Sequence, residues 1–202
     1  MTSSPVSWLR GRLATLRHYH EVAGVGEIAR RYFAMNAFDG VLTTLGVVAG
    51  GYIGHVHVAR AIISVGLAAA VAMGVSGFYG SYLIERAERD RALRELEEAT
   101  LSPLDDTDIA SASTYATIVI ALVDGLSPFV AAIIVLLPFF FAGESVGRSV
   151  YFTAAAIAFV ELFLLGMFLG RVSRQRLVWS GVKLAIAGLV CLGLSALLDW
   201  GL

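Results

Sequence analysis

The sequence is poor in charge and in cysteine, and each shortage excludes a class of protein. Only 15% of its residues are charged, whereas an ordinary globular chain has about 25%. Apolar residues make up 57% of the 202 residues, so the composition argues against a soluble domain. The single cysteine, Cys191, excludes both a disulfide framework and a cysteine-based metal site.

Motifs of well-known catalytic sites are also lacking. The sequence has no nucleotide-binding loop, zinc-protease helix or serine nucleophile elbow. We therefore expect no enzyme, no permanently bound cofactor and no nucleic-acid partner. No apolar core of signal-peptide length follows the basic N-terminus before Tyr32, so we expect no cleaved signal. Without a soluble domain to couple ATP hydrolysis, any transport by this chain would be passive or driven by an ion gradient.

Five long apolar segments dominate the chain. A spanning helix needs about 20 mostly apolar residues, and the segments that reach this length are 32–53, 61–84, 115–141, 150–170 and 177–198. The third contains Pro128 and Pro138, which kink a helix but are tolerated inside a bundle. The sequence predicts an all-α integral membrane protein with five transmembrane helices, crossing the cell membrane several times.

Basic residues are distributed unequally between the two sides of these spans. The side that contains the N-terminus has thirteen of them: Arg10, Arg12, Arg17, Arg30, Arg31, Arg86, Arg89, Arg91, Arg94, Arg171, Arg174, Arg176 and Lys183. The other side has only Arg60 and Arg148. Because basic loops stay in the cytoplasm, we expect a cytoplasmic N-terminus and a C-terminus outside.

Two cytoplasmic segments are expected to be helical outside the spans. In residues 1–31 the spacing of Leu9, Leu13, Leu16 and His20 predicts an amphipathic helix on the inner membrane surface. Residues 32–202 then form the transmembrane domain, with a cytoplasmic helical link over 85–114.

Within this link, residues 85–100 contain no helix breaker, so we expect them to extend the second helix. Salt bridges such as Glu85–Arg89 and Asp90–Arg94 would support the extension. Residues 102–108 are expected to form a loop that caps the third helix.

Three carboxylic acids lie inside predicted spans: Asp39, Asp124 and Glu161. A charge at the bilayer centre costs about 2.5–3.5 kcal/mol on the most lenient scale, so such residues face a bundle interior or an aqueous cavity. Each acid is either a polar clamp between helices or a site for a cation or a proton.

Helical spacing places each acid on a face of small residues, which favours the site over the clamp. Asp39 shares its face with Thr43, Gly46 and Gly50, and Asp124 lies close to Ser127. Carboxylates suit Mn²⁺ or Mg²⁺, and a thioether shifts the preference towards transition metals. We expect a divalent-metal site formed by Asp39, Met73, Asp124 and Glu161, with Thr43 and Ser127 as accessory residues. Simple packing is the alternative for Met73.

Acidic and histidine residues near the membrane surfaces are weaker candidates. Glu85 and Glu88 could collect cations at the cytoplasmic entrance, although a solvated helix with salt bridges is the alternative. His55 and His57 form an H-x-H pair in the predicted outer loop, where metal capture competes with an ordinary loop.

The first span contains a specific motif. Residues 36–50 read NAFDGVLTTLGVVAG, which resembles the first helix of the vacuolar iron transporter family, with its N-x-x-D-G start. Residues 72–79, AMGVSGFY, are similar to the second-helix stretch S-M-x-x-G-E-[FY], and residues 136–139, LLPF, to a third-helix motif. The resemblance covers most of residues 32–141, and only its first-helix part is specific.

The resemblance implies a homodimer that exports Fe²⁺ or Mn²⁺ from the cytoplasm, with protons as the counter-ion. Asp39 matches the family's first-helix acid and Met73 its second-helix methionine, but Gly77 stands where the family has a glutamate. The cytoplasmic metal-binding helices are also short, which indicates a distant prokaryotic branch. Asp124 or Glu161 could supply the missing carboxylate.

Two other functions are compatible with the same residues. The chain could be a membrane scaffold that transports nothing. It could also be an intramembrane aspartyl protease in which Asp39 and Asp124 share a proton. The protease is disfavoured because that class usually has a G-x-G pattern directly before the second aspartate. In this sequence Leu122 and Val123 precede Asp124.

Overall fold

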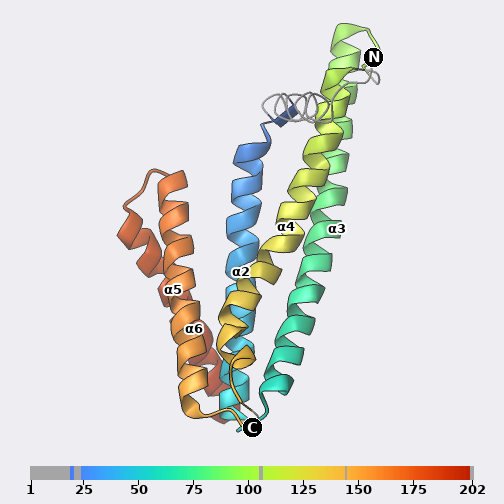
Figure 1. The fold of residues 1–202 in the computed structure, drawn as a ribbon. Helices are drawn as coiled ribbons and strands as arrows, with labels where there is room; N and C mark the ends of the chain where they lie inside the picture. Colours follow the sequence, from blue (N-terminus) through green and yellow to red (C-terminus); the bar gives the residue numbers. More distant parts are fainter. Residues whose placement is uncertain (1–18, 21–23, 105–106, 144, 201–202) are drawn as a thin grey trace, which may run out of the picture. The chain divides into compact units, whose positions relative to one another are not determined.

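Five helices account for nearly all of the described chain (Figure 1). The computed structural model describes residues 19–20, 24–104, 107–143 and 145–200, and of residues 199 and 200 only the backbone. The helices are α2 (Val25–Ile53), α3 (Ala59–Thr100), α4 (Asp108–Phe140), α5 (Arg148–Val172) and α6 (Leu177–Trp200). Each contains a stretch long and apolar enough to cross a membrane, which confirms the predicted five-helix count.

Several helix ends differ from the predicted spans. Helix α2 begins seven residues before the predicted start at residue 32, because Val25 packs in a small apolar cluster with Ala116 and Ile120. Helix α4 begins at Asp108, where the hydroxyl of Thr107 accepts a hydrogen bond from the Ala110 N–H at 3.4 Å. Thr107 is therefore the N-cap that the predicted capping loop provides.

The predicted amphipathic N-terminal helix falls mostly outside the described residues, which include only Tyr19 and His20 of it. The orientation of the chain in the membrane and the predicted domain boundary at residue 31 remain predictions.

The chain divides into two compact units, which we describe separately. The first unit contains the described residues up to Tyr32 together with residues 77–124, and the second contains residues 33–76 and 125–202. In the second unit the apolar core is built from α2, α3, α4 and α5, with Val41, Leu45, Leu136, Phe139 and Leu162 fully or almost fully buried.

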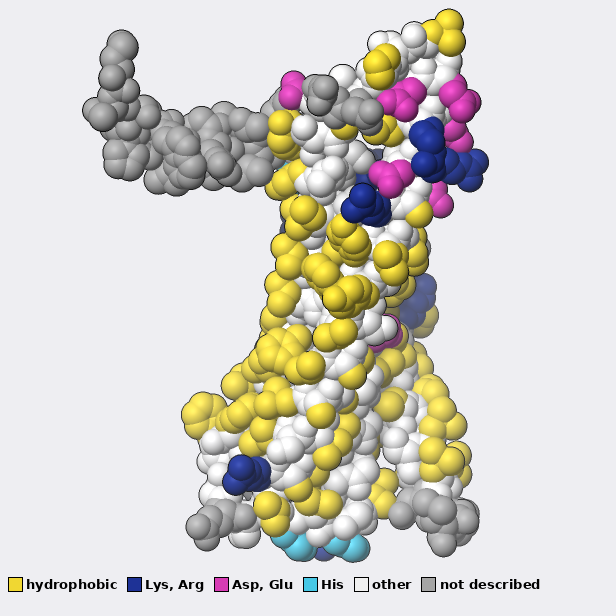
Figure 2. Space-filling model, turned by 90° about the vertical axis from the view of Figure 1, so that its right-hand side faces the viewer, with side chains coloured by type: hydrophobic (Ala, Val, Ile, Leu, Met, Phe, Trp, Pro, Cys, Tyr) yellow, Lys and Arg dark blue, Asp and Glu magenta, His cyan; other side chains and the backbone are white. Residues whose placement is uncertain are grey.

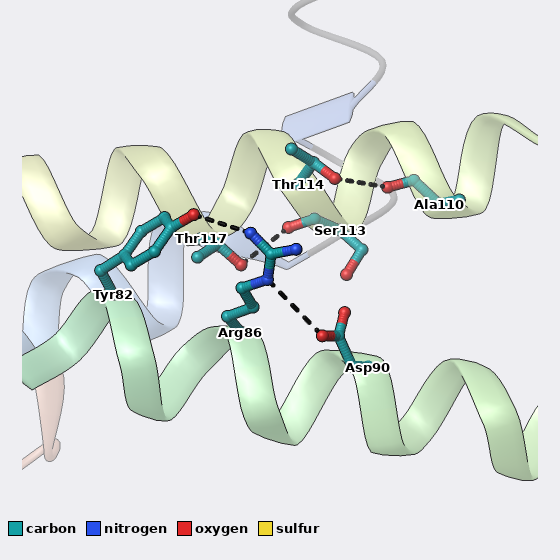
Figure 3. Close-up of polar contacts among 7 residues, drawn as sticks. All are labelled: Tyr82, Arg86, Asp90, Ala110, Ser113, Thr114 and Thr117. Carbon is teal, nitrogen blue, oxygen red and sulfur yellow. Dashed lines mark hydrogen bonds and ion pairs between the residues drawn. The ribbon is translucent and has the colours of Figure 1, made fainter. Parts of the chain in front are cut away.

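In the first unit, helix α3 continues without a break to Thr100, which confirms the predicted extension of the second helix. Figure 2 shows acidic and basic side chains gathered together on the surface of this extension. Arg86 donates a hydrogen bond to the Tyr82 hydroxyl at 2.9 Å and pairs with Asp90 at 3.6 Å (Figure 3). Asp90 thus pairs with Arg86 and not, as predicted, with Arg94. These exposed pairs contribute little stability each.

Helices α2 and α4 of the second unit approach each other at a glycine. A Cβ atom built on Gly40 would lie 2.6 Å from both the Cα and the carbonyl oxygen of Pro128. Real Cβ atoms essentially never come this close to backbone atoms. Gly40 is therefore required for the close packing of α2 on α4, and this contact fixes the direction in which the neighbouring Asp39 points.

We expect Gly40→Ala to destabilise the protein. The methyl group gains up to about 1 kcal/mol of helix propensity, but overpacking against backbone that cannot rotate away costs about 1–3 kcal/mol or more. Gly193→Ala is the matched control, because a Cβ atom at Gly193 would meet nothing within 4 Å. Thermal unfolding of the purified chain, followed by circular dichroism, should show a lower midpoint for Gly40→Ala alone; equal midpoints would contradict the close contact.

Candidate metal-transport site

Asp39 lies on a face of α2 that the rest of the described chain leaves largely uncovered. Its side chain is exposed, as is that of Thr43 one turn further along the helix. A Cβ atom built on Gly46 or Gly50 would meet nothing within 4 Å. We call these four residues the Asp39 face. No helix of the described chain packs against its glycines, whereas Gly40, beside Asp39 in the sequence, packs closely against Pro128.

Asp124, by contrast, is buried in the first unit, with only 4% of its surface exposed. It lies against Gly77 of α3: a Cβ atom on Gly77 would be 3.3 Å from both the backbone oxygen and the Oδ2 atom of Asp124. The carboxylate of Asp124 therefore approaches the position at which the family resemblance implies a glutamate. In addition, Pro128 has no N–H with which to donate the usual i to i−4 helical bond to the Asp124 carbonyl.

Glu85 lies in the same unit and already has partners. Its carboxylate accepts a hydrogen bond from the Tyr32 hydroxyl and pairs with Arg89 at 3.3 Å. Only 9% of Glu85 is exposed. Tyr32 also interacts electrostatically with Asp124. These contacts support the salt-bridge interpretation for Glu85 over cation capture, whereas Glu88 on the same helix is exposed.

The other predicted ligands belong to the second unit. Met73 on α3 and Glu161 on α5 are both half-buried. The Oε2 atom of Glu161 is buried and has no hydrogen-bond partner within the described structure. A carboxylate in this state is costly. Glu161 therefore needs a proton, a cation or a partner from another molecule.

The described part of one chain does not contain a complete metal centre. In residues 19–20, 24–104, 107–143 and 145–200, no group of three or more His, Cys, Asp or Glu side chains is placed to hold a metal ion. The accessory Ser127 is buried on α4, and the accessory Thr43 is exposed on α2. The predicted set of Asp39, Met73, Asp124 and Glu161 stays a prediction.

Sequence reasoning missed two features that concern these residues. It did not associate Tyr32 with Glu85, although a tyrosine at the predicted start of a span is a frequent polar anchor. It also did not single out as packing positions the two glycines that follow Asp39 and Asp124 in the sequence, Gly40 and Gly125. Each glycine lies at a helix crossing within the second unit: Gly40 contacts Pro128, and the Gly125 carbonyl would be 2.7 Å from a Cβ atom on Gly74.

These features define a multi-pass helical membrane protein with carboxylates inside its spans. The family model of the VIT family matches residues 104–199. An uncharacterized protein of the archaeon Methanocaldococcus jannaschii is 30% identical over 167 residues, which cover 81% of this chain and 85% of that relative. The chain belongs to the VIT family, as its first-helix motif predicted. This membership indicates a membrane metal-ion transporter, because members of the family are transporters and not enzymes.

Proposed function

We propose that this protein exports a divalent transition metal, Fe²⁺ or Mn²⁺, from the cytoplasm across the cell membrane in exchange for protons, and that it works as a homodimer. The observation that carries the proposal is the open Asp39 face on α2. A carboxylate facing lipid would cost about 2.5–3.5 kcal/mol or more, so another molecule must cover this face.

A second copy of the chain suits the Asp39 face. Small residues let helix backbones approach closely within a membrane, and Gly46 and Gly50 leave the necessary space. In a two-fold symmetric dimer the interface is formed by the same face of both copies. Two Asp39 carboxylates would then lie close together, and their combined charge favours a divalent cation between them. The symmetry would complete a centre that the described part of one chain lacks.

The remaining residues suggest how metal and protons could be coupled. Met73 would supply a soft sulfur ligand, which favours Fe²⁺ or Mn²⁺ over Mg²⁺. Asp124, beside Gly77, would replace the glutamate that the family has at this position. Glu161 has a buried oxygen with no hydrogen-bond partner among the described residues and is a candidate proton carrier. A carboxyl group must lose its proton before it binds metal, so metal binding releases protons.

The direction of export rests on the unequal distribution of basic residues. With thirteen basic residues on the side of the N-terminus and two on the other, the exposed Glu88 and the rest of the α3 extension would face the cytoplasm. Metal would then enter beside this extension and leave at the end of the spans that includes His55.

Flux measurements should separate this function from a scaffold and from a protease. In sealed liposomes with an acidic lumen, we expect the reconstituted full chain to take up Fe²⁺ and Mn²⁺ faster than protein-free liposomes, and faster than it takes up Mg²⁺. Co²⁺ and Zn²⁺ should be compared in the same assay, and collapsing the proton gradient should slow uptake. Flux equal to that of protein-free liposomes would contradict the transporter and favour a membrane scaffold. Cleavage of a transmembrane peptide would identify an intramembrane protease.

A further inference from the structure

Two adjoining cavities lie in the second unit, where α2 ends and α5 begins. The first, which we call the polar cavity, has a volume of about 500 Å³ and is lined by residues that include His55, His57 and Arg148. The second, the apolar groove, also has a volume of about 500 Å³ and is lined by α2, α5 and α6. Tyr52, Ile53 and Tyr151 line both, so the two cavities lie side by side.

Hydrogen bonds hold the polar cavity in shape. His55 has a positive φ of 52°, and its N–H bonds to the Tyr52 carbonyl at 3.2 Å. The Val146 N–H donates to the His57 carbonyl at 2.8 Å, and the Tyr151 hydroxyl donates to the Val56 carbonyl at 2.5 Å. The loop between α2 and α3 is therefore anchored to both α2 and α5, and the cavity is preformed.

The polar cavity favours an anion. Arg148 is always protonated and can donate two hydrogen bonds to one phosphate group. His55 and His57 add further donors, and none of the described residues that line the cavity is acidic. Arg148 is also the first residue of α5, and the N-cap residue of this helix is Gly147, which has no side chain to form a capping bond. The helix start adds a partial positive charge.

The apolar groove lies beside this cavity and is lined by residues of three spans, α2, α5 and α6. On α5 its lining runs from Tyr151 to Phe159, which is about 12 Å at 1.5 Å per residue. Ala155 and Ala156 keep the groove open, and Leu192 of α6 closes one side. Two tyrosines mark the boundary between the polar and apolar parts, as expected of aromatic residues at a membrane–water interface.

We propose that the polar cavity and the apolar groove together bind one membrane phospholipid, with its phosphate at Arg148 and one acyl chain in the groove. A free phosphate ion would use only the polar cavity and leave the groove without a function. A metal ion at His55 and His57 would be opposed by the charge of Arg148. Basic pockets between transmembrane helices at the cytoplasmic surface bind anionic lipid head groups, and the same pairing of arginine with phosphate acts at either surface of a membrane.

Lipid retention by the purified full chain tests this proposal, with phosphatidylglycerol as the lipid and native mass spectrometry as the measurement. The wild-type chain should retain one phosphatidylglycerol and bind diacylglycerol, which lacks the phosphate, more weakly. Arg148→Gln should lower the affinity about tenfold, the effect of losing one charge-assisted hydrogen bond. Arg148→Lys should keep part of it. Ala156→Trp should also weaken binding by filling the groove.

Arg60→Gln is the matched control, because Arg60 is exposed near the same loop and lines neither cavity. The control should bind like the wild type; equal losses for Arg60→Gln and Arg148→Gln would overturn the proposal as non-specific attraction. Full competition by inorganic phosphate, with Ala156→Trp unaffected, would identify a free-anion site instead. Saturable Co²⁺ binding lost in His55→Ala and strengthened in Arg148→Gln would identify a metal site and would equally overturn it.

Discussion

Replacing Asp39 with Asn should leave the protein folded and reduce Fe²⁺ and Mn²⁺ flux by about 10- to 100-fold or more, since even loss of a residue that only supports a metal ligand has an effect of this size. Asn has nearly the same shape as Asp and can still form hydrogen bonds. It cannot neutralise a divalent cation or take up a proton. Flux into sealed liposomes, measured at equal protein content, gives the result directly.

The stability of Asp39→Asn separates a ligand from a structural clamp. Asp39 is exposed on an apolar helix, so removing its charge relieves the cost of placing a carboxylate in the membrane. We therefore expect a thermal midpoint at least as high as that of the wild type. Asp90→Asn is the control for a general effect of charge, because Asp90 lies in an exposed pair with Arg86 at 3.6 Å. Wild-type flux in a folded Asp39→Asn variant would rule out the proposed role.

The number of helices could be predicted from the sequence because each span is one long apolar segment with few charges. The helix ends could not. The first turns of α2 contain Arg30 and Arg31, so their average hydropathy is low, and they are helical because Val25 packs against Ala116 and Ile120. Pairings on the α3 extension were also uncertain. Asp90 has an arginine one turn away on both sides, and the Arg86 that it contacts is also bonded to Tyr82.

For the candidate site, too, the sequence shows which residues lie in the spans but not which neighbouring helices pack against them. Acids within apolar spans are evident from sequence because a charge in the membrane is costly. Whether another helix packs against a glycine on the same span depends on where the helices cross. Gly40 packs closely against Pro128, whereas a Cβ atom on Gly46 or Gly50 would contact no neighbouring residue. The sequence has the same residue type at all three positions, so only the structure distinguishes packing glycines from an uncovered face.

Family membership was also recognised from a different part of the chain. The specific motif in the sequence lies at residues 36–50 of α2, whereas the family model matches residues 104–199, which include α4, α5 and most of α6. In those helices the single sequence has only one short motif similar to the family, LLPF at residues 136–139, and otherwise a shared hydrophobicity. Position-specific preferences within apolar helices become visible only when many members are compared.

Exchanging the carboxylate between Asp124 and residue 77 should restore transport that either single change removes. Asp124 is 4% exposed, and its Oδ2 atom would lie 3.3 Å from a Cβ atom on Gly77. Gly77→Glu alone would place a second carboxylate beside the first, where like charges disfavour ionisation of both and destabilise the fold. Asp124→Asn alone would remove the only carboxylate at this contact. We expect each single variant to lose most of its Fe²⁺ flux.

The double variant Gly77→Glu/Asp124→Asn returns one carboxylate to the same place from the other helix, in the arrangement that the family resemblance implies. We expect its flux to exceed that of Asp124→Asn, so that the two substitutions are strongly non-additive, as is usual for residues in contact. Gly77→Gln/Asp124→Asn has the same bulk without the charge and should stay inactive. If the two double variants have equal flux, or if the effects of the two substitutions simply add, Asp124 is a structural residue. The missing glutamate would then be compensated elsewhere, and Glu161 would be the next residue to test.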